Sequence, residues 1–173
     1  HSDVCGPMKT TSMGGCKYFV TFIDDFSRKI WLYPIKAKSE CFDKFKEFKT
    51  LVENQSDMKI KVFRSDNGGE YMSKKFDELL KKEGIARQTS TPYTPQQNGV
   101  AERANRTIVE MARSMLHAQN LKLDLWAEAV VNAVYTRNPC STSAVQIMTP
   151  EQAWSGRQPC VAHMRIFGCI AYA

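Results

Sequence analysis

Residues 64–70 read RSDNGGE and residues 93–103 read YTPQQNGVAER, and these two segments decide how the whole chain is interpreted. The first places an aspartate, Asp66, where a strand meets a Gly-Gly turn. The second leads from a loop into a long helix, with Glu102 in the first turn of that helix. Loops at the ends of strands often carry functional groups, so both acids are candidate functional residues.

Strands are predicted upstream of RSDNGGE. Residues 18–23 (YFVTFI) and 29–35 (KIWLYPI) are rich in aromatic and β-branched side chains and flank the polar segment 24–27. This pattern is typical of a β-hairpin. A shorter extended segment contains Asp3 and must end at Gly6-Pro7, because proline cannot donate a hydrogen bond to a neighbouring strand.

Helices separate the strands. Ser39 is a candidate N-cap for a helix whose apolar residues recur at helical spacing, namely Cys41, Phe45, Phe48 and Val52. Ile60 and Val62 then alternate with lysines, which predicts a strand that runs directly into Asp66. A short helix is expected from Ser73, with Phe76, Leu79 and Leu80 facing inward and Gly84 as its C-terminal stop.

The second half of the chain is predicted to be mainly helical after a fifth strand over residues 85–89. Residues 100–116 carry one apolar helical face. Asp124 is a candidate cap for a helix over 125–136, which is apolar nearly all round and is therefore expected to be buried. A helical turn is expected after Thr149-Pro150, and residues 166–173 are expected to form a strand. Strands first, then strands alternating with helices, predict a mixed α/β sheet.

Composition narrows the class of partner. The 173 residues contain 24 Lys and Arg against 18 Asp and Glu, a net charge of +6. That excess favours a polyanionic partner, although an ordinary basic surface explains it equally well. No apolar run approaches the roughly 18 residues of a membrane span, and no signal peptide is visible. The six cysteines include no CxxC pair, so we expect free thiols in a reducing compartment.

Three acids stand out by context: Asp3 on the first strand, Asp66 and Glu102, the last two separated by residues 67–101, which number 35. Divalent cations such as Mg²⁺ prefer oxygen ligands, and two aspartates on neighbouring strands can bridge a pair of ions. Each acid also has a structural explanation. Asp3 can be an exposed strand-end residue, Asp66 an Asx-turn former, and Glu102 an acid favoured by the helix dipole.

A family resemblance favours the functional interpretation. The segments that carry it are HSDVCGPM (1–8), YFVTFIDDFSRKIWLYPIKAKSE (18–40), KVFRSDNGGEY (61–71), TPYTPQQNGVAERANRTIVEMARSML (91–116), LWAEAV (125–130) and MRIFGCIAYA (164–173). Together they resemble the integrase region of Ty1/copia-type retrotransposon polyproteins over essentially the whole chain. The combination of RSDNGGE with YTPQQNGVAER at this distance is highly specific.

The resemblance implies an RNase H-like fold, with a five-stranded mixed sheet flanked by helices. It also implies that Asp3, Asp66 and Glu102 form the D,D-35-E triad, which binds Mg²⁺ or Mn²⁺, with two ions expected. The implied reactions are trimming of the element's DNA 3′ ends and strand transfer into host DNA, which is a nuclease and transferase chemistry without a covalent enzyme intermediate. The absence of any Ser-His or Cys-His constellation agrees with this mechanism.

DNA contacts are expected around the triad. Asn98, Asn105 and Arg106 lie three or four residues from Glu102 and share its helical face. The predicted DNA-binding residues are Tyr93, Gln97, Asn98, Arg103, Asn105 and Arg106. Two of these have equally simple alternatives, because Arg103 can be a solvated helix arginine and Tyr93 can pack the base of its loop instead of stacking on a nucleobase.

The predicted organisation is a catalytic core over residues 1–137 and an incomplete C-terminal extension over 138–173. Family members have a zinc module before the core and begin the first strand upstream of Asp3, so we expect this segment to fold marginally and to catalyse poorly in isolation. Expected partners are element-end DNA, target DNA and further copies of the chain, with no membrane. The expected location is the nucleus, after particle assembly in the cytoplasm.

Two other functions remain open at this point. The chain can be a non-catalytic nucleic-acid-binding remnant of a decayed or captured element. It can also be a nuclease of the same fold that cleaves RNA–DNA hybrids, although the 35-residue spacing and the YTPQQNGVAER loop are integrase features.

Overall fold

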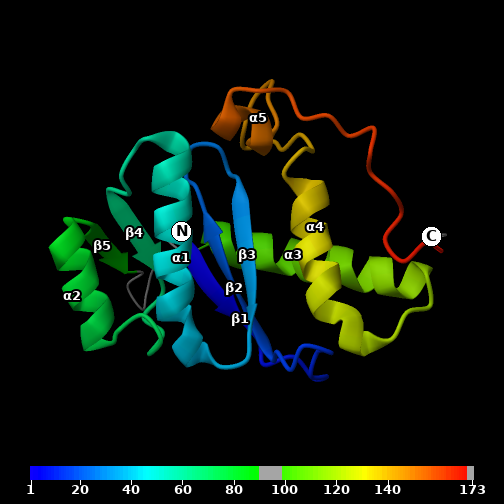
Figure 1. Ribbon diagram of the computed structural model, residues 1–173, viewed down its shortest axis with the longest axis horizontal. Helices are drawn as coiled ribbons and strands as arrows, with labels where there is room; N and C mark the ends of the chain where they lie inside the picture. The colour runs from blue at the N-terminus through cyan, green and yellow to red at the C-terminus, as the bar shows by residue number, and fades with distance from the viewer. Residues whose placement is uncertain (90–98, 171–173) are drawn as a thin grey trace.

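The computed structural model describes residues 1–89 and 99–170, and its elements form three layers (Figure 1). The strands are β1 (Ser2–Cys5), β2 (Tyr18–Ile23), β3 (Ile30–Ile35), β4 (Val62–Ser65) and β5 (Ala86–Thr89). The helices are α1 (Cys41–Ser56), α2 (Lys74–Glu83), α3 (Gly99–Ala118), α4 (Trp126–Arg137) and α5 (Pro150–Ser155). Helix α1 covers one face of the β1–β3 sheet, whereas α3 and α4 cover the other.

The strands form two sheets. In the first, β1, β2 and β3 are antiparallel, and the register places Asp3 opposite Thr21. In the second, β4 and β5 are parallel. The predicted mixed α/β architecture with flanking helices is confirmed, but the described strands do not form one five-stranded sheet. Strand β4 lies beside β1 without a backbone ladder, and Tyr71, in the segment that follows β4, places its hydroxyl 2.7 Å from the Ser2 hydroxyl on β1.

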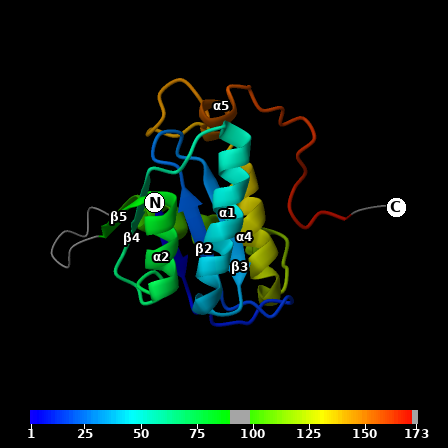
Figure 2. The same ribbon diagram turned by 60° about the vertical axis from the view of Figure 1, so that its left-hand side comes forward.

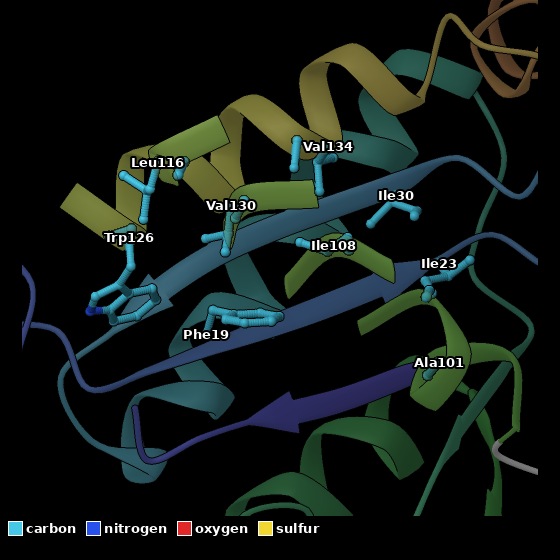
Figure 3. Close-up of a cluster of buried hydrophobic side chains, with 14 residues drawn as sticks. Phe19, Ile23, Ile30, Ala101, Ile108, Leu116, Trp126, Val130 and Val134 are labelled. Carbon is cyan, nitrogen blue, oxygen red and sulfur yellow. The ribbon is translucent and has the colours of Figure 1, made fainter. Parts of the chain in front are cut away.

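Strand β2 is buried on both faces, and its alternation assigns side chains to two cores. Phe19 and Ile23 point toward α3 and α4, where they join the cluster that also contains Ile108 and Val130 (Figure 3). Val20 and Phe22 alternate with them and point toward α1, whereas Thr21 points to the α3 side. Successive side chains of a strand point to opposite faces, so a hydrophobic run such as YFVTFI is the sequence of a central strand.

The core under α1 is mainly aromatic. Phe45 is fully buried, and its ring centroid lies 5.9 Å from that of Phe22, 4.7 Å from Phe63 and 5.0 Å from Phe76. These four rings come from α1, β2, β4 and α2, so this cluster packs the two sheets together. The predicted inward face of α1 is confirmed, because all four of its members are buried: Cys41, Phe45, Phe48 and Val52.

The predicted ends of α2 are correct. The Ser73 hydroxyl accepts a hydrogen bond from the backbone N–H of Phe76, and Gly84 ends the helix with a φ of 68°. Of the predicted inward residues, Phe76 and Leu80 are buried and Leu79 is half-buried. A left-handed C-terminal residue favours glycine because glycine lacks the Cβ that makes this conformation costly.

Two other predicted caps are wrong for a common reason. Ser39 lies inside a 3₁₀ turn, Lys38–Glu40, and α1 then begins at Cys41 without a side-chain cap. Asp124 lies inside the 3₁₀ turn Leu123–Leu125, and α4 begins at Trp126. In both places the chain enters the α-helix through a tighter turn, which moves the helix start past the residue that would have capped it.

Three further predictions on the pattern of burial and structure need correction. Val62 is 44% exposed and Phe63 is buried, because the phase that points Phe63 inward adds an aromatic ring to the core. Helix α4 is not buried all round, since Val131 and Tyr135 are 44% and 48% exposed. Residues 166–170 form no strand, and the rest of the predicted strand lies outside the described residues.

The remaining helix predictions are confirmed. Helix α3 spans Gly99–Ala118 and buries the predicted face. Helix α5 starts at Pro150, and the Thr149 hydroxyl accepts a hydrogen bond from the backbone N–H of Gln152. Across residues 1–89 and 99–170, no helix has the length and apolar character needed to cross a membrane.

We expect Phe45→Ala to lower the free energy of unfolding by about 3–5 kcal/mol, because it removes the ring that contacts three others and leaves a cavity. Phe26→Ala is the matched control, since Phe26 is 77% exposed and its loss should change stability by less than about 0.5 kcal/mol. Urea unfolding followed by circular dichroism measures both. Equal effects of the two substitutions would contradict the assigned core.

Candidate active site

Asp3 is held by a chain of hydrogen bonds between the sheet and α3. The Asn105 side-chain amide donates to Asp3 Oδ2 at 2.9 Å, and the Thr21 hydroxyl donates to Asn105 Oδ1 at 2.9 Å. Asn105 is only 4% exposed and Thr21 is fully buried. Because Asp3 and Thr21 are opposite each other on β1 and β2, this chain fixes the Asp3 carboxylate on the α3 side of the sheet.

Asp66 directly follows β4 and shapes its own turn. The backbone N–H of Gly68 donates to Asp66 Oδ1 at 3.0 Å, and the N–H of Tyr71 donates to the Gly68 carbonyl at 2.9 Å. A Cβ at Gly68 would lie 2.9 Å from both Asp66 Oδ1 and the Glu70 carboxyl carbon. The structural interpretation of Asp66 as an Asx-turn former is therefore correct, and the turn leaves the second carboxylate oxygen outside this hydrogen bond.

Tyr71 connects the two aspartate segments. It is fully buried, its hydroxyl lies 2.7 Å from Ser2 Oγ, and its carbonyl accepts a hydrogen bond from the Arg87 guanidinium at 2.7 Å. Burial raises the pKa of the Tyr71 phenol well above its usual range, so the hydroxyl remains neutral. Sequence reasoning missed this residue, although the aromatic side chain directly after RSDNGGE was a usable indication.

Glu102 and its neighbours lie on the solvent side of α3. Glu102 is exposed in the first turn of the helix, and Arg106, one turn further along, is also exposed. The Arg103 side chain folds back over Gly99, where a Cβ would lie 3.0 Å from its guanidinium Nη1. The predicted DNA contacts Tyr93, Gln97 and Asn98 lie outside the described residues.

Asn105 lies elsewhere than expected. The sequence places it on the face of Glu102, but the structure buries it under β1 and β2, with its amide bonded to Asp3 and Thr21. Asn105 lies four residues after Ala101 and three before Ile108, so its position on the helix falls within the buried face, and its polar side chain finds hydrogen-bond partners in the sheet. In this structure Asn105 positions Asp3 and does not face solvent.

The three acids influence one another electrostatically. The pKa of Asp3 is raised from 3.8 to about 6, first by burial and then by the negative charge of Asp66, with a smaller contribution from Glu102. The hydrogen bond from Asn105 opposes this rise because it stabilises the ionised carboxylate. Within the described part of the chain, none of the three acids forms an ion pair, while Lys38, which pairs with Glu70 at 3.1 Å, also interacts electrostatically with Asp66.

The donor set suits a hard divalent cation, because carboxylate oxygens are the ligands that Mg²⁺ prefers and the mutual repulsion of the acids leaves a negative charge to be neutralised. As the side chains stand, no group of three His, Cys, Asp or Glu residues in the described ranges converges closely enough to hold an ion. Asp3 lies on β1, Asp66 follows the adjacent strand β4, and Glu102 lies on α3. The chemistry of these donors fits a cation, but the three carboxylates are too widely spaced to bind one ion together.

Comparison with known proteins identifies the family. Residues 1–95 match the integrase core domain family. The chain belongs to this family. It is 49% identical over 173 residues to the retrovirus-related Pol polyprotein from transposon TNT 1-94 of Nicotiana tabacum, an alignment that covers all of this chain and 13% of that polyprotein. This integrase core therefore spans a small part of the length of its curated relative.

Solved structures show the same fold as this integrase core. The simian T-cell lymphotropic virus intasome in complex with PP2A regulatory subunit B56 gamma gives a TM-score of 0.70 at 19% identity, over 99% of this chain and 56% of that chain. The HTLV-2 integrase catalytic core domain in complex with magnesium gives a TM-score of 0.62 at 22% identity, over 88% and 92%. The predicted RNase H-like fold is confirmed.

We expect the burial of the Asp3 charge to make the metal-free chain less stable as pH rises from about 4 to about 6. The folded state keeps the Asp3 proton up to a pKa of about 6, whereas the unfolded state loses it near 3.8, so the contribution of Asp3 to stability is highest below 3.8 and is lost as pH rises through 6. Asp3→Asn should remove this loss and stabilise the chain by roughly 1–3 kcal/mol at pH 8.

Thermal melts in a chelating buffer at pH 4 and pH 8 measure the difference between Asp3→Asn and the parent. The expected difference is close to zero at pH 4 and largest at pH 8. A difference that does not change with pH would contradict the assignment of the buried charge to Asp3.

Asn105→Ala should have the opposite effect on stability. It leaves the Thr21 hydroxyl and the Asp3 carboxylate without their shared partner, which should cost about 1–3 kcal/mol. The pKa of Asp3 should rise further, because the hydrogen bond that stabilises its ionised form is lost. Carbon-detected NMR titration of the Asp3 carboxyl measures the pKa. Asn54→Ala, at an exposed position on α1, is the control and should leave that pKa unchanged.

Proposed function

We propose that this chain is the catalytic core of a retrotransposon integrase, which carries out divalent-metal-dependent 3′-end processing and strand transfer of element DNA. The single observation that carries the proposal is the electrostatic coupling of Asp3 to Asp66 and Glu102, three acids that arrive from two adjacent strands and a helix. Such a concentration of unneutralised carboxylates is costly for a fold and is typical of functional sites.

In this proposal Asp3, Asp66 and Glu102 hold Mg²⁺ or Mn²⁺, and two ions are expected. A bound divalent cation supplies positive charge against which the negative charge of phosphoryl transfer develops. Asn105 and Thr21 keep the Asp3 carboxylate oriented, and the Asx turn keeps Asp66 oriented. The protein's contribution is therefore positioning and electrostatics rather than covalent catalysis.

Strand transfer needs no nucleophile from the protein. The 3′-hydroxyl oxygen of the element end attacks a target phosphorus, and the bond from that phosphorus to the target's 3′ oxygen breaks. The attacking hydroxyl releases its proton to water, and the departing 3′ oxygen takes one up from water, so a new 3′-hydroxyl is left on the target. End processing is the same displacement with water as the attacking group. Arg103 and Arg106, with Tyr93, Gln97 and Asn98, are proposed to hold the DNA end beside Glu102.

The remaining expectations are also proposals. Residues 1–137 are proposed to be the catalytic core and residues 138–173 an extension that packs on it. The Asn138 side chain exchanges two hydrogen bonds with the backbone of Ile30, at 3.0 and 2.9 Å, and Lys29 pairs with Glu151 at 2.8 Å. The proposed partners are element-end DNA, target DNA and further copies of the chain, acting in the nucleus after cytoplasmic particle assembly.

A strand-transfer assay with labelled element-end DNA tests the function, with the 173-residue chain assayed beside the same residues in the longer Pol-encoded integrase. Asp66→Asn and Glu102→Gln should each reduce joined product by at least about a thousandfold, because each removes a proposed metal ligand. Glu110→Gln is the matched control, since it is an exposed glutamate two turns further along α3. It should retain the parent's activity.

The spacing of the acids favours one alternative, because no three of them in the described residues converge closely enough to hold a cation. The alternative is a non-catalytic DNA-binding remnant of a decayed element. DNA binding without cutting or joining, in the parent and in the Asp66 and Glu102 variants alike, would support the remnant and contradict the integrase.

A further inference from the structure

A basic pocket lies on the flank of α3, outside the carboxylate site. It has a volume of about 340 Å³ and lies between the β2–β3 turn, the first half of α3, the end of α4 and the segment after α4. Figures 1 and 2 show that this segment and α5 lie at the same end of the molecule as the β2–β3 turn. The pocket wall includes the apolar side chains of Ile23, Ile30 and Ala104.

Three arginines from three elements line this pocket: Arg28 from the β2–β3 turn, Arg103 from α3 and Arg137 from α4. Arg28 shares its charge with Asp25 at 2.8 Å. Arg103 and Arg137 have no ion pair or side-chain hydrogen bond with any described residue. Among the described residues no acidic side chain lines the pocket, so its charge is positive and only partly neutralised.

Hydroxyl groups complete the pocket. Thr107, Thr142 and Ser143 line it beside the arginines. The Thr142 Oγ1 atom is buried and has no hydrogen-bond partner within the described residues. A buried hydroxyl without a partner costs free energy, and a rotation that turned Thr142 Oγ1 into the pocket would let it donate to a ligand oxygen. The second feature that points to a ligand is therefore independent of the charge.

We propose that this pocket binds a phosphate group of the DNA backbone. Guanidinium groups pair with phosphate oxygens, and hydroxyls supply further donors, so the chemistry of the wall matches one tetrahedral anion. The DNA source of that phosphate rests on the proposed function. The site itself is separate from the triad, because Arg28, Arg137 and Thr142 belong to neither the carboxylates nor the DNA contacts proposed above.

The position of the pocket relative to Glu102 explains how one DNA strand can reach both the pocket and the carboxylate site. Arg103 is the next residue along α3, and successive residues are about 100° apart around a helix axis. The pocket thus opens on the adjacent flank of the helix that carries Glu102. A phosphate bound there would anchor the strand outside the reacting centre and would set the direction in which it leaves.

Fluorescence anisotropy with a blunt duplex of element-end sequence, at several salt concentrations in Mg²⁺ buffer, tests the pocket. The decisive variant is Arg137→Gln, and Arg103→Gln and the double variant accompany it. Each lost phosphate contact should reduce the slope of log affinity against log salt by about 0.9, which corresponds to roughly eightfold weaker binding at 0.1 M salt than in the parent. Melting temperatures show that each variant folds.

Arg113→Gln is the matched control. It removes the same charge from an exposed position on α3, about 15 Å along the helix from Arg103, and lies outside the pocket. Its slope should stay within 0.3 of the parent's. If Arg137→Gln and Arg113→Gln bind DNA alike, the pocket proposal is overturned while the integrase proposal stands.

A titration with inorganic phosphate separates the two proposals. It is followed by NMR of the arginine side-chain Nε–H groups, and the resonances of Arg103 and Arg137 should shift while that of Arg113 does not. If the parent binds no DNA, the integrase proposal fails and so does the DNA source of the phosphate. Absence of a shift at Arg103 and Arg137 overturns the pocket as a phosphate site.

Discussion

The hydrogen bonds that hold a charged carboxylate at Asp3 are the constraint on which the rest of the site depends. Asp3 is on a four-residue strand, so its orientation comes from outside the strand, from Asn105 on α3 and Thr21 on β2. Because Asn105 must reach β1, the first turns of α3 lie against the sheet. That packing brings Glu102 near Asp3 and gives the fold an acidic centre in which none of the three acids forms an ion pair with a described residue.

The two cores on either side of β2 serve this arrangement differently. The core between β2 and the helices α3 and α4 fixes these two helices against the sheet, and it therefore also fixes the positions of Glu102 and Asn105. The aromatic side joins α1, α2 and β4 to β2, and so fixes where Asp66 follows its strand. Tyr71 connects the aromatic core to the site, because it packs in that core and hydrogen bonds to Ser2, the neighbour of Asp3. The packing that stabilises Tyr71 therefore also helps to fix the position of Asp3.

The sequence predicted the structural features that follow from one local pattern, and it missed the features for which two patterns compete over the same residues. The β2–β3 hairpin, the buried face of α1 and the glycine at the end of α2 each follow from one periodicity or one backbone preference. Ser39 had a cap-like residue type, but a 3₁₀ turn took its place. Val62 had the right alternation in the wrong phase, because a neighbouring phenylalanine gains more by burial.

The site shows the same division. Spacing and residue type were enough to select three acids, but for Asn105 the polar residue type hid the helical spacing from Ala101 and Ile108 that places it on the buried face. Asn105 is buried on that face because the half-buried Asp3 carboxylate and the buried Thr21 hydroxyl both bond to its amide, and these hydrogen bonds offset the cost of burying a polar side chain. The pocket of arginines was invisible for a related reason, since its members come from segments far apart in the chain.

Charge separation across α3 links the chemistry to binding. The unneutralised carboxylates repel a nucleic-acid backbone when no cation is present, so the affinity that brings DNA to them must come from elsewhere on the surface. The chain has an excess of six positive charges, and Arg103 and Arg137 are two that no acidic side chain in the described residues neutralises. In the proposed function, the basic flank beside the acidic centre would let the protein bind the strand before the centre has to approach it. Binding and chemistry can then be altered separately by substitution.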